Sequence, residues 1–378
     1  MSEWKKCPIG EVVTLRQGFA INAKSKHYMS KEETSLPLLR IADMKNGTKE
    51  VFVKEEIPQR FIAHPEDIIY TRTGNVGLVF RNNYGVMHNN CFSVTPNDAD
   101  ELSRDFLYYA LQNKTFFDTA NALARGAAQP DLPHTSFNSI EFAYPSLFAQ
   151  ERIATILSRY DSLIENYQKQ IKLLEEAAQR LYKEWFVDLR FPGHENTKIV
   201  DGVPEGWTPS QLGQLAEFKR GKTITKKDVI DGDIPVVAGG LEPAYYCNKS
   251  NTAERVITIS GSGANAGFTR MYFEKVWASD CSFVDASITP FLHFVYCFLK
   301  DNKTRIDHLQ KGAAQPHVYA KDINSLEICV SSESVLKSFE EKVSKCFDTI
   351  ASLQSQLRLL TEARDRLLPK LLSGEITV

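Results

Sequence analysis

The hexapeptide "RGAAQP" occupies residues 125–130, and "KGAAQP" returns at residues 311–316. The two copies stand 186 positions apart, and "NSIE" (138–141) precedes "NSLE" (324–327) at the same offset. Self-similarity at a fixed offset is the signature of a repeated architecture. The sequence therefore predicts an internal repeat of one structural unit, in the order globular domain, helix, globular domain, helix.

Each globular part has a mixed pattern. "EDIIYTRTGNVGLVFRN" (66–82) and "AERVITISGSGANAGFTRMYF" (253–273) are β-branched and aromatic runs broken by Gly and Asn, which predicts strand–turn–strand. Residues 103–120 and 289–307 have helical spacing of apolar residues. We therefore expect a mixed α/β domain of the α+β class in each half.

Two long segments carry apolar residues at alternating steps of three and four, which is the spacing of a heptad seam. The first seam comprises Ile153, Leu157, Tyr160, Ile164, Tyr167, Ile171, Leu174, Ala178, Leu181 and Trp185. The second comprises Leu336, Phe339, Val343, Cys346, Ile350, Leu353, Leu357, Leu360, Arg364 and Leu367. Such seams predict a coiled coil of the two helices, antiparallel or parallel, and the alternative is two separate surface helices packed on their own domains. Pro369 is expected to end the second helix, and Arg364 interrupts its seam where Ala178 stands in the first.

These patterns set the domain boundaries. We predict a first globular domain at 1–146, a first long helix at 147–189, a linker at 190–206, a second globular domain at 207–332, a second long helix at 333–368 and a tail at 369–378. A helix of 33 residues spans roughly 50 Å. Antiparallel pairing would place the two domains at opposite ends of a rod about a pseudo-twofold axis, and such domains could read two DNA half-sites at least one turn apart.

Composition excludes some classes of protein. The formal net charge is −2, so DNA binding would rest on local patches rather than on the field of a whole domain. The seven cysteines are scattered without a CxxC pair, which indicates reduced thiols and no zinc site. The longest apolar stretch, "PFLHFVYCFL" (290–299), is about half a membrane span, and the first residues do not resemble a signal peptide. We expect a cytoplasmic protein.

Three motifs suggest chemistry but depart from the required pattern. "RGKT" (220–223) has Ala216 where a P-loop needs glycine. "GSGANAG" (261–267) is followed by a strand-like run instead of the helix that a dinucleotide site needs. "PDLPHTSFNSIEFA" (130–143) lacks the lysine of a nuclease motif. We therefore expect no catalytic residue and a binding or assembly protein.

The chain resembles the DNA-specificity (S) subunit of type I restriction-modification systems over essentially its full length. The resemblance is carried by "RLYKEWFVDLRFPGHE" (180–195), "LLPKLLSGEI" (367–376), "VPEGW" (203–207) and the two "GAAQP" segments. It implies two target-recognition domains, each reading one half of a bipartite asymmetric sequence, with the long helices packed antiparallel as spacers between the half-sites. It also implies docking of two modification (methyltransferase) subunits and of restriction-translocase subunits. S-adenosylmethionine, ATP and Mg would bind those partners, and no cofactor or metal would bind this chain.

The resemblance also suggests roles for individual residues. The candidates for phosphate contacts are Arg16, Lys24, Lys26 and Arg125 in the first domain and Lys219, Arg220, Lys222, Lys227 and Lys311 in the second. The glycine hairpins that could approach DNA carry Arg72, Thr73, Asn75, Ser262 and Asn265. The candidates for base readout are Gln129, Asp131, His134, Gln315, His317 and Tyr319.

Two other functions stay open from the residues alone. One is a two-headed coiled-coil adaptor that binds proteins and not DNA, which the near-neutral charge favours. The other is a stand-alone enzyme that uses the glycine-rich segment, which would be stabilised by a nucleotide.

Overall fold

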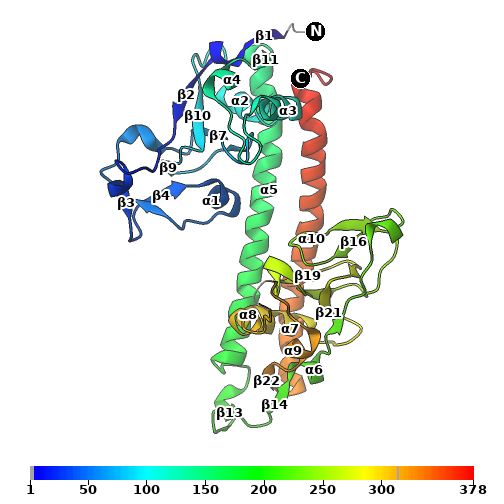
Figure 1. The fold of residues 1–378 in the computed structure, drawn as a ribbon. Helices are drawn as coiled ribbons and strands as arrows, with labels where there is room; N and C mark the ends of the chain where they lie inside the picture. Colours follow the sequence, from blue (N-terminus) through cyan, green and yellow to red (C-terminus); the bar gives the residue numbers. More distant parts are fainter. Residues whose placement is uncertain (1–3, 313–314) are drawn as a thin grey trace. The chain divides into compact units, whose positions relative to one another are not determined.

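The computed structural model describes residues 4–312 and 315–378, which form two compact units (Figure 1). Unit 1 contains Met1–Glu165 and Arg358–Val378, and unit 2 contains Asn166–Leu357. Each unit therefore combines one globular domain with part of each long helix. The prediction of two α+β domains and two long helices is confirmed.

The first domain contains a four-stranded antiparallel sheet that holds the predicted glycine turn. Its strands lie in the order β2 (Val13–Gln17), β10 (Cys91–Pro96), β7 (Ile68–Thr71) and β8 (Val79–Phe80). A second sheet lies in the order β3 (Met29–Ser30), β5 (Phe52–Val53), β4 (Leu36–Leu39), β9 (Gly85–Met87) and β6 (Ile62–Ala63). A two-stranded pair joins β1 (Lys5–Pro8) to β11 (Glu141–Tyr144).

The helical spacing at 103–120 corresponds to two helices instead of one. Ser103 caps the first, where its side chain accepts from the Phe106 N–H, and Asn113 caps the second by accepting from the Thr115 N–H at 3.0 Å. A capping asparagine in the middle of an apolar pattern therefore divides it. The helices of this domain are α1 (Ile41–Asn46), α2 (Arg104–Ala110), α3 (Lys114–Leu123) and α4 (His134–Asn138).

The second domain repeats this topology with a smaller second sheet. Its four-stranded antiparallel sheet has the order β15 (Lys219–Arg220), β21 (Cys281–Asp285), β18 (Val256–Ser260) and β19 (Thr269–Tyr272). Its two-stranded pair is β14 (Thr208–Gln211) with β22 (Glu327–Val330), and its three-stranded sheet is β17 (Tyr245–Cys247), β16 (Ile234–Val237) and β20 (Trp277–Ala278). The helices are α6 (Leu212–Leu215), α7 (Leu292–Asp301), α8 (Lys303–Asp307) and α9 (Ala320–Asn324). The chain segment that precedes this domain forms a short hairpin of β12 (Ile199–Val200) and β13 (Val203–Pro204).

The two domains share local detail as well as topology. A Cβ on Gly10 would lie 2.6 Å from Cβ of Asn138, and a Cβ on Gly213 would lie 2.8 Å from Cβ of Asn324. The glycines are 203 positions apart (213 − 10) and the asparagines 186 (324 − 138), so the first domain is 17 residues longer between these points. The larger second sheet of the first domain lies within this stretch, which explains why the upstream similarity of the sequences is thin.

The long helices are α5 (Leu147–Tyr182), continued by a π-helical turn at Lys183–Val187, and α10 (Glu333–Leu372). In unit 1 the start of α5 and the end of α10 share one core, through Leu157 and Leu371. In unit 2 the end of α5 and the start of α10 share another, through Tyr182 and Phe339. The helices therefore run antiparallel within each unit, as predicted. Every predicted seam position is buried or half-buried.

The expectation that Pro369 ends the second helix is wrong, because α10 continues through it to Leu372. Proline lacks the N–H that would bond back to Asp365. The next residues, Leu371 and Leu372, are 1% and 7% exposed in the core of unit 1, and the Ser373 N–H donates to the Pro369 carbonyl at 2.9 Å. Burial of these leucines stabilises the final turn despite the proline.

Phe339 is the residue on which the helix packing in unit 2 most depends. It is fully buried, and its ring lies 5.8 Å from that of Trp185 and 5.1 Å from that of Phe186. We predict that Phe339→Ala lowers the free energy of unfolding by about 3–5 kcal/mol, because it leaves a cavity between the two helices. Urea unfolding followed by circular dichroism measures this.

Leu359→Ala is the matched control on the same helix, because Leu359 is 55% exposed. Its effect should stay within about 0.5 kcal/mol. Equal losses from both substitutions would contradict the assignment of the seam.

Candidate nucleic-acid interface

The first "GAAQP" segment forms a closed hairpin. The Arg125 N–H donates to the Asp131 carbonyl and the Asp131 N–H donates to the Arg125 carbonyl, both at 2.8 Å. Gly126, between them, has φ of +97°, and a Cβ there would lie 2.8 Å from the carbonyl oxygen of Gln129. Glycine is therefore required at this position. The hairpin leaves the side chains of Arg125 and Gln129 exposed.

The second segment forms the same hairpin. The Lys311 and His317 backbones exchange hydrogen bonds of 2.9 and 2.8 Å, and Gly312 again has φ of +97°. Gln315 is exposed like Gln129. The two alanines of this copy, at 313–314, lie outside the described residues.

In each domain the hairpin is bonded to the glycine loop that follows a central strand. In the first, the Leu132 N–H donates to the Arg72 carbonyl at 2.9 Å and the Gly74 N–H donates to the Pro130 carbonyl at 2.8 Å. In the second, the equivalent bonds, from Val318 to Gly261 and from Gly263 to Pro316, are both 3.0 Å. The two domains therefore hold the same backbone frame and carry different side chains on it.

In the first domain this frame holds a connected polar network. Asp131 accepts from Arg72 Nε at 3.2 Å and Nη2 at 2.6 Å, and from Thr73 Oγ1 at 2.5 Å. Arg72 Nη1 also donates to Gln17 Oε1 at 3.1 Å. Partial burial raises the pKa of Asp131, but the hydrogen bonds from Arg72 and Thr73 outweigh it and leave the pKa below its ordinary value. The carboxylate therefore stays ionised and fixes the direction of the guanidinium.

His134, at the start of α4, is a packed side chain. Its ring lies edge-on to Phe92 at 4.9 Å, and its Nε2 is buried and has no hydrogen-bond partner among the described residues. Burial, followed by the positive charge of Arg72, lowers its pKa, against the influence of Asp131. The imidazole is therefore neutral at physiological pH, and one of its nitrogens faces the interior.

The second domain places different groups on the same frame. Ser262 donates its hydroxyl to Asp280, and the rings of His317 and Tyr319 stack 6.0 Å apart at 16°. A small pocket beside them is lined by Arg220, Asp280, His317 and Tyr319 among others. Asn265 lies on the glycine loop and donates to the Gly239 carbonyl at 3.4 Å. The structure thus brings together residues that were predicted for three separate roles.

The predicted phosphate contacts fall into two groups. Seven basic side chains are exposed and form no ion pair with a described residue: Lys24, Lys26, Arg125, Lys219, Arg220, Lys222 and Lys227. Arg16 instead donates to the carbonyls of Arg60 and Ile62 and pairs with Asp67 at 2.7 Å. Lys311 pairs with Asp322 at 2.8 Å. These last two already stabilise their own domains, and a phosphate role for them stays a prediction.

Two residues of the interface were missed from the sequence. Gln17 lies in the network of Arg72, and Asp280 lies in the pocket of the second domain. Gln17 corresponds to Arg220 at the offset of 203 that holds for this part of the chain. Residues 4–24 and 207–227 show this register in the sequence, but Gln17 belongs to no motif that would mark it. Nothing in the sequence around Asp280 distinguished it.

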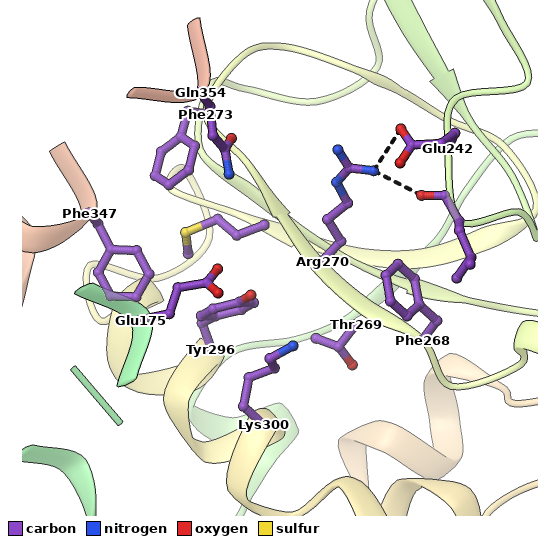
Figure 2. Close-up of a pocket in the computed structure, with 12 residues that line it drawn as sticks. Glu175, Glu242, Phe268, Thr269, Arg270, Phe273, Tyr296, Lys300, Phe347 and Gln354 are labelled. Carbon is purple, nitrogen blue, oxygen red and sulfur yellow. Dashed lines mark hydrogen bonds and ion pairs between the residues drawn. The ribbon is translucent and has the colours of Figure 1, made fainter. Parts of the chain in front are cut away.

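A larger pocket of about 340 Å³ lies in unit 2, and no predicted site residue lines it (Figure 2). Within it, Arg270 donates to the Leu241 carbonyl at 2.8 Å and pairs with Glu242 at 3.1 Å. Burial raises the pKa of Glu175, against the influence of nearby Lys300. This pocket is distinct from the residues on the hairpins.

Cys91 and Cys281, the first residues of β10 and β21, are buried. Burial raises the pKa of Cys91 and that of Cys281 to about 12, so both thiols stay protonated. The described residues also contain no cluster of three side chains suited to hold a metal ion. No helix among them is both long and apolar enough to span a bilayer.

Comparison with known proteins identifies the family. The model of the type I restriction modification DNA specificity domain matches residues 1–176 and 204–333, which is most of the chain. The specificity subunit of the type I restriction enzyme MjaIX of Methanocaldococcus jannaschii is 28% identical over 311 residues, covering 76% of this chain and 72% of that protein. The MjaVIII specificity subunit of the same organism is 26% identical over 408 residues, covering 100% and 93%.

A solved structure shows the same fold. The crystal structure of the S subunit of a type I restriction-modification system from M. genitalium matches with a TM-score of 0.64. It is 21% identical and covers 98% of this chain and 96% of that chain. The resemblance seen in the sequence is confirmed, and a protein-binding adaptor is not favoured. The chain belongs to the family of type I restriction-modification DNA specificity proteins, with one such domain in each of its halves.

Proposed function

We propose that this chain is the non-catalytic specificity subunit of a type I restriction-modification complex, and that each domain reads one half of a bipartite asymmetric DNA sequence. One observation carries the proposal. Both domains bond an equivalent hairpin to a glycine loop through the same pair of backbone hydrogen bonds, yet Asp131 and Arg72 in the first correspond to His317 and Gly261 in the second. A shared frame with exchanged side chains is what two different half-sites require.

The side chains that the hairpin and glycine loop of each domain present determine which bases that domain can read. In the second domain His317, Tyr319 and Gln315 present ring and amide groups, and amides suit the edge of adenine. In the first domain Asp131 orients the Arg72 guanidinium, which suits guanine O6 and N7. Asn75 and Gln129 are exposed beside it. Because the two sets differ, the two half-sites differ in sequence.

Phosphate contacts would position each domain on the duplex without specifying sequence. The exposed lysines next to the first strands of each sheet supply them, namely Lys24 and Lys26 in the first domain and Lys219, Lys222 and Lys227 in the second. Arg125 adds a cation on the first hairpin. These local patches account for DNA binding by a chain whose net charge is −2.

A specificity subunit works in a complex with DNA and with the other restriction-modification subunits. In our proposal two modification subunits dock on this chain, and restriction-translocase subunits complete the nuclease. S-adenosylmethionine, ATP and Mg bind those partners, and this chain binds none of them. The complex acts in the cytoplasm.

The function is tested by mapping methylated adenines across the genome with this chain and its methyltransferase partner present, and then with the chain deleted. We expect a split asymmetric motif that disappears on deletion. Methylation that is unchanged by the deletion would refute the proposal.

Substitution of His317 should affect one half-site only. We predict that His317→Ala relaxes the preference at one base position of the second half by about 1–3 kcal/mol and leaves the first half unchanged. Methylation mapping of cells with the variant chain measures both halves at once, so the first half is the internal control. An equal loss of preference in both halves would contradict the assignment of this hairpin.

Removal of a phosphate contact should weaken binding to all sequences alike. We predict that Lys222→Ala lowers the slope of log affinity against log salt by about 1 and leaves the recognised motif unchanged. Binding of the assembled complex to duplex DNA at several salt concentrations measures the slope. Lys275→Ala is the matched control, because Lys275 is exposed in the same domain and lies outside the predicted interface. Equal slopes for the two variants would remove Lys222 from the interface.

A further inference from the structure

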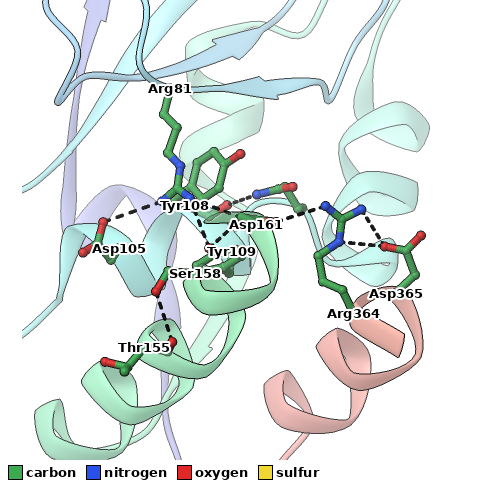
Figure 3. Close-up of polar contacts among 10 residues, drawn as sticks. Arg81, Asp105, Tyr108, Tyr109, Thr155, Ser158, Asp161, Arg364 and Asp365 are labelled. Carbon is green, nitrogen blue, oxygen red and sulfur yellow. Dashed lines mark hydrogen bonds and ion pairs between the residues drawn. The ribbon is translucent and has the colours of Figure 1, made fainter. Parts of the chain in front are cut away.

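Unit 1 contains a nearly buried carboxylate that joins its two long helices. Asp161 on α5 accepts from Arg364 Nη1 on α10 at 3.0 Å, from Tyr109 Oη at 2.7 Å and from Arg81 Nη2 at 3.2 Å (Figure 3). The Asp161 side chain is 12% exposed and the Arg364 side chain 28%. Arg364, which interrupts the apolar seam of the sequence, is therefore one half of a cross-helix ion pair.

The repeat has an apolar pair at the equivalent place in unit 2. The offset of 186 relates Asp161 to Phe347 (161 + 186) and Ala178 to Arg364 (178 + 186). Phe347 and Ala178 are 1% and 2% exposed and belong to one buried cluster. The ring of Phe347 also stacks on His293 at 4.5 Å. The same cross-helix position is therefore ionic in one unit and apolar in the other.

We propose that this difference makes each long helix select the other helix of the chain and reject a second copy of itself. The repeat makes such a choice necessary, because α5 and α10 carry similar seams and a seam by itself does not distinguish one partner from another. Pairing α5 with α10 places Asp161 against Arg364 and Ala178 against Phe347. If a helix instead pairs with the same helix of a second copy, in the same antiparallel register, each of these four residues faces a different partner.

Two α10 helices from different copies would place Arg364 against Phe347. The guanidinium would then face a cluster in which Phe347 contacts His293, Tyr296 and Phe273, and it would lose the Asp161 carboxylate. Asp365, on the same helix, would still accept from Arg364 Nε and Nη2, but Nη1 would lose its bond to Asp161. A donor of a charged group left unpaired against an apolar cluster is unfavourable.

Two α5 helices would place Asp161 against Ala178. Asp161 would keep Arg81 and Tyr109, which come from its own domain, but would lose the hydrogen bond from Arg364. Removal of one partner from a buried charge pair costs more than the pair contributes. Both like pairings are therefore disfavoured, and neither argument depends on what the domains bind.

The test uses two full-length copies that carry different affinity tags and are expressed together. The double variant Asp161→Ala/Arg364→Ala removes both charges. Phe347 of α10 would then face an alanine whether α10 pairs with α5, at Ala178, or with a second α10, at the substituted position 364. We expect this variant to capture the second copy at least about tenfold more than the wild-type chain does. Arg364→Lys keeps a cation at the helix face and should capture no more than wild type.

Ile164→Ala is the matched control for loss of stability, because Ile164 is 7% exposed on the same helix face and carries no charge. If Ile164→Ala captures the second copy as well as the double alanine variant does, the proposal is overturned. It is also overturned if the double alanine variant has a native circular dichroism spectrum and captures no more of the second copy than the wild-type chain does. If the double alanine chain does not fold, Asp161→Asn/Arg364→Gln removes the charges and keeps the shapes. Background capture by that variant would equally overturn the proposal.

Discussion

The structure depends on the way a seven-residue hairpin is bonded to a glycine loop. Two backbone hydrogen bonds close the hairpin between Arg125 and Asp131, and two more join it to the loop that begins at Arg72. Backbone bonds are indifferent to side-chain identity, so this frame tolerates any residue at its outward positions. The glycine at 126 and at 312 is the exception, because both positions have a φ of +97°. A frame of this kind allows recognition to change while the fold stays fixed.

The long helices impose a different constraint, which is the choice of partner. Each helix contributes one end to each unit, and the apolar seam supplies most of the burial through residues such as Leu157 and Phe339. Apolar packing is strong but poorly selective between two similar repeats. The pair of Asp161 and Arg364 buries little apolar area, and in our proposal it determines which helix is accepted as the partner. In this account stability and selectivity reside in different residues of the same seam.

Much of this architecture could be predicted from the sequence, because it follows from spacing. The heptad steps predicted both helices and a coiled coil between them, and the glycine-broken β runs predicted the central hairpins. The antiparallel direction came from the family resemblance. Pro369 shows where local rules fail, since burial of Leu371 and Leu372 in a distant core stabilises a turn that proline disfavours. The division of residues 103–120 into two helices depended on a single cap at Asn113.

The sequence predicted which segments form the candidate site but not the contacts between their side chains. The repeated hairpins indicated where to look, but the partner of each side chain is set by contacts across the fold. Arg16 was predicted to contact phosphate, yet it is bound to Asp67, 51 positions away. Asp131 was predicted to read a base, yet it is held by Arg72 and Thr73. Such pairings join segments far apart in the chain, and no local pattern encodes them.

The central claim is that each domain specifies its own half-site through residues on a common frame. The most direct measurement is methylation mapping with a chain whose second domain (207–332) is replaced by a copy of the first (1–146). The account predicts a new motif with the same half-sequence in both halves, because both frames would then carry the side chains of the first domain. A motif that keeps the original second half would contradict it, since specificity would then reside outside the exchanged domains.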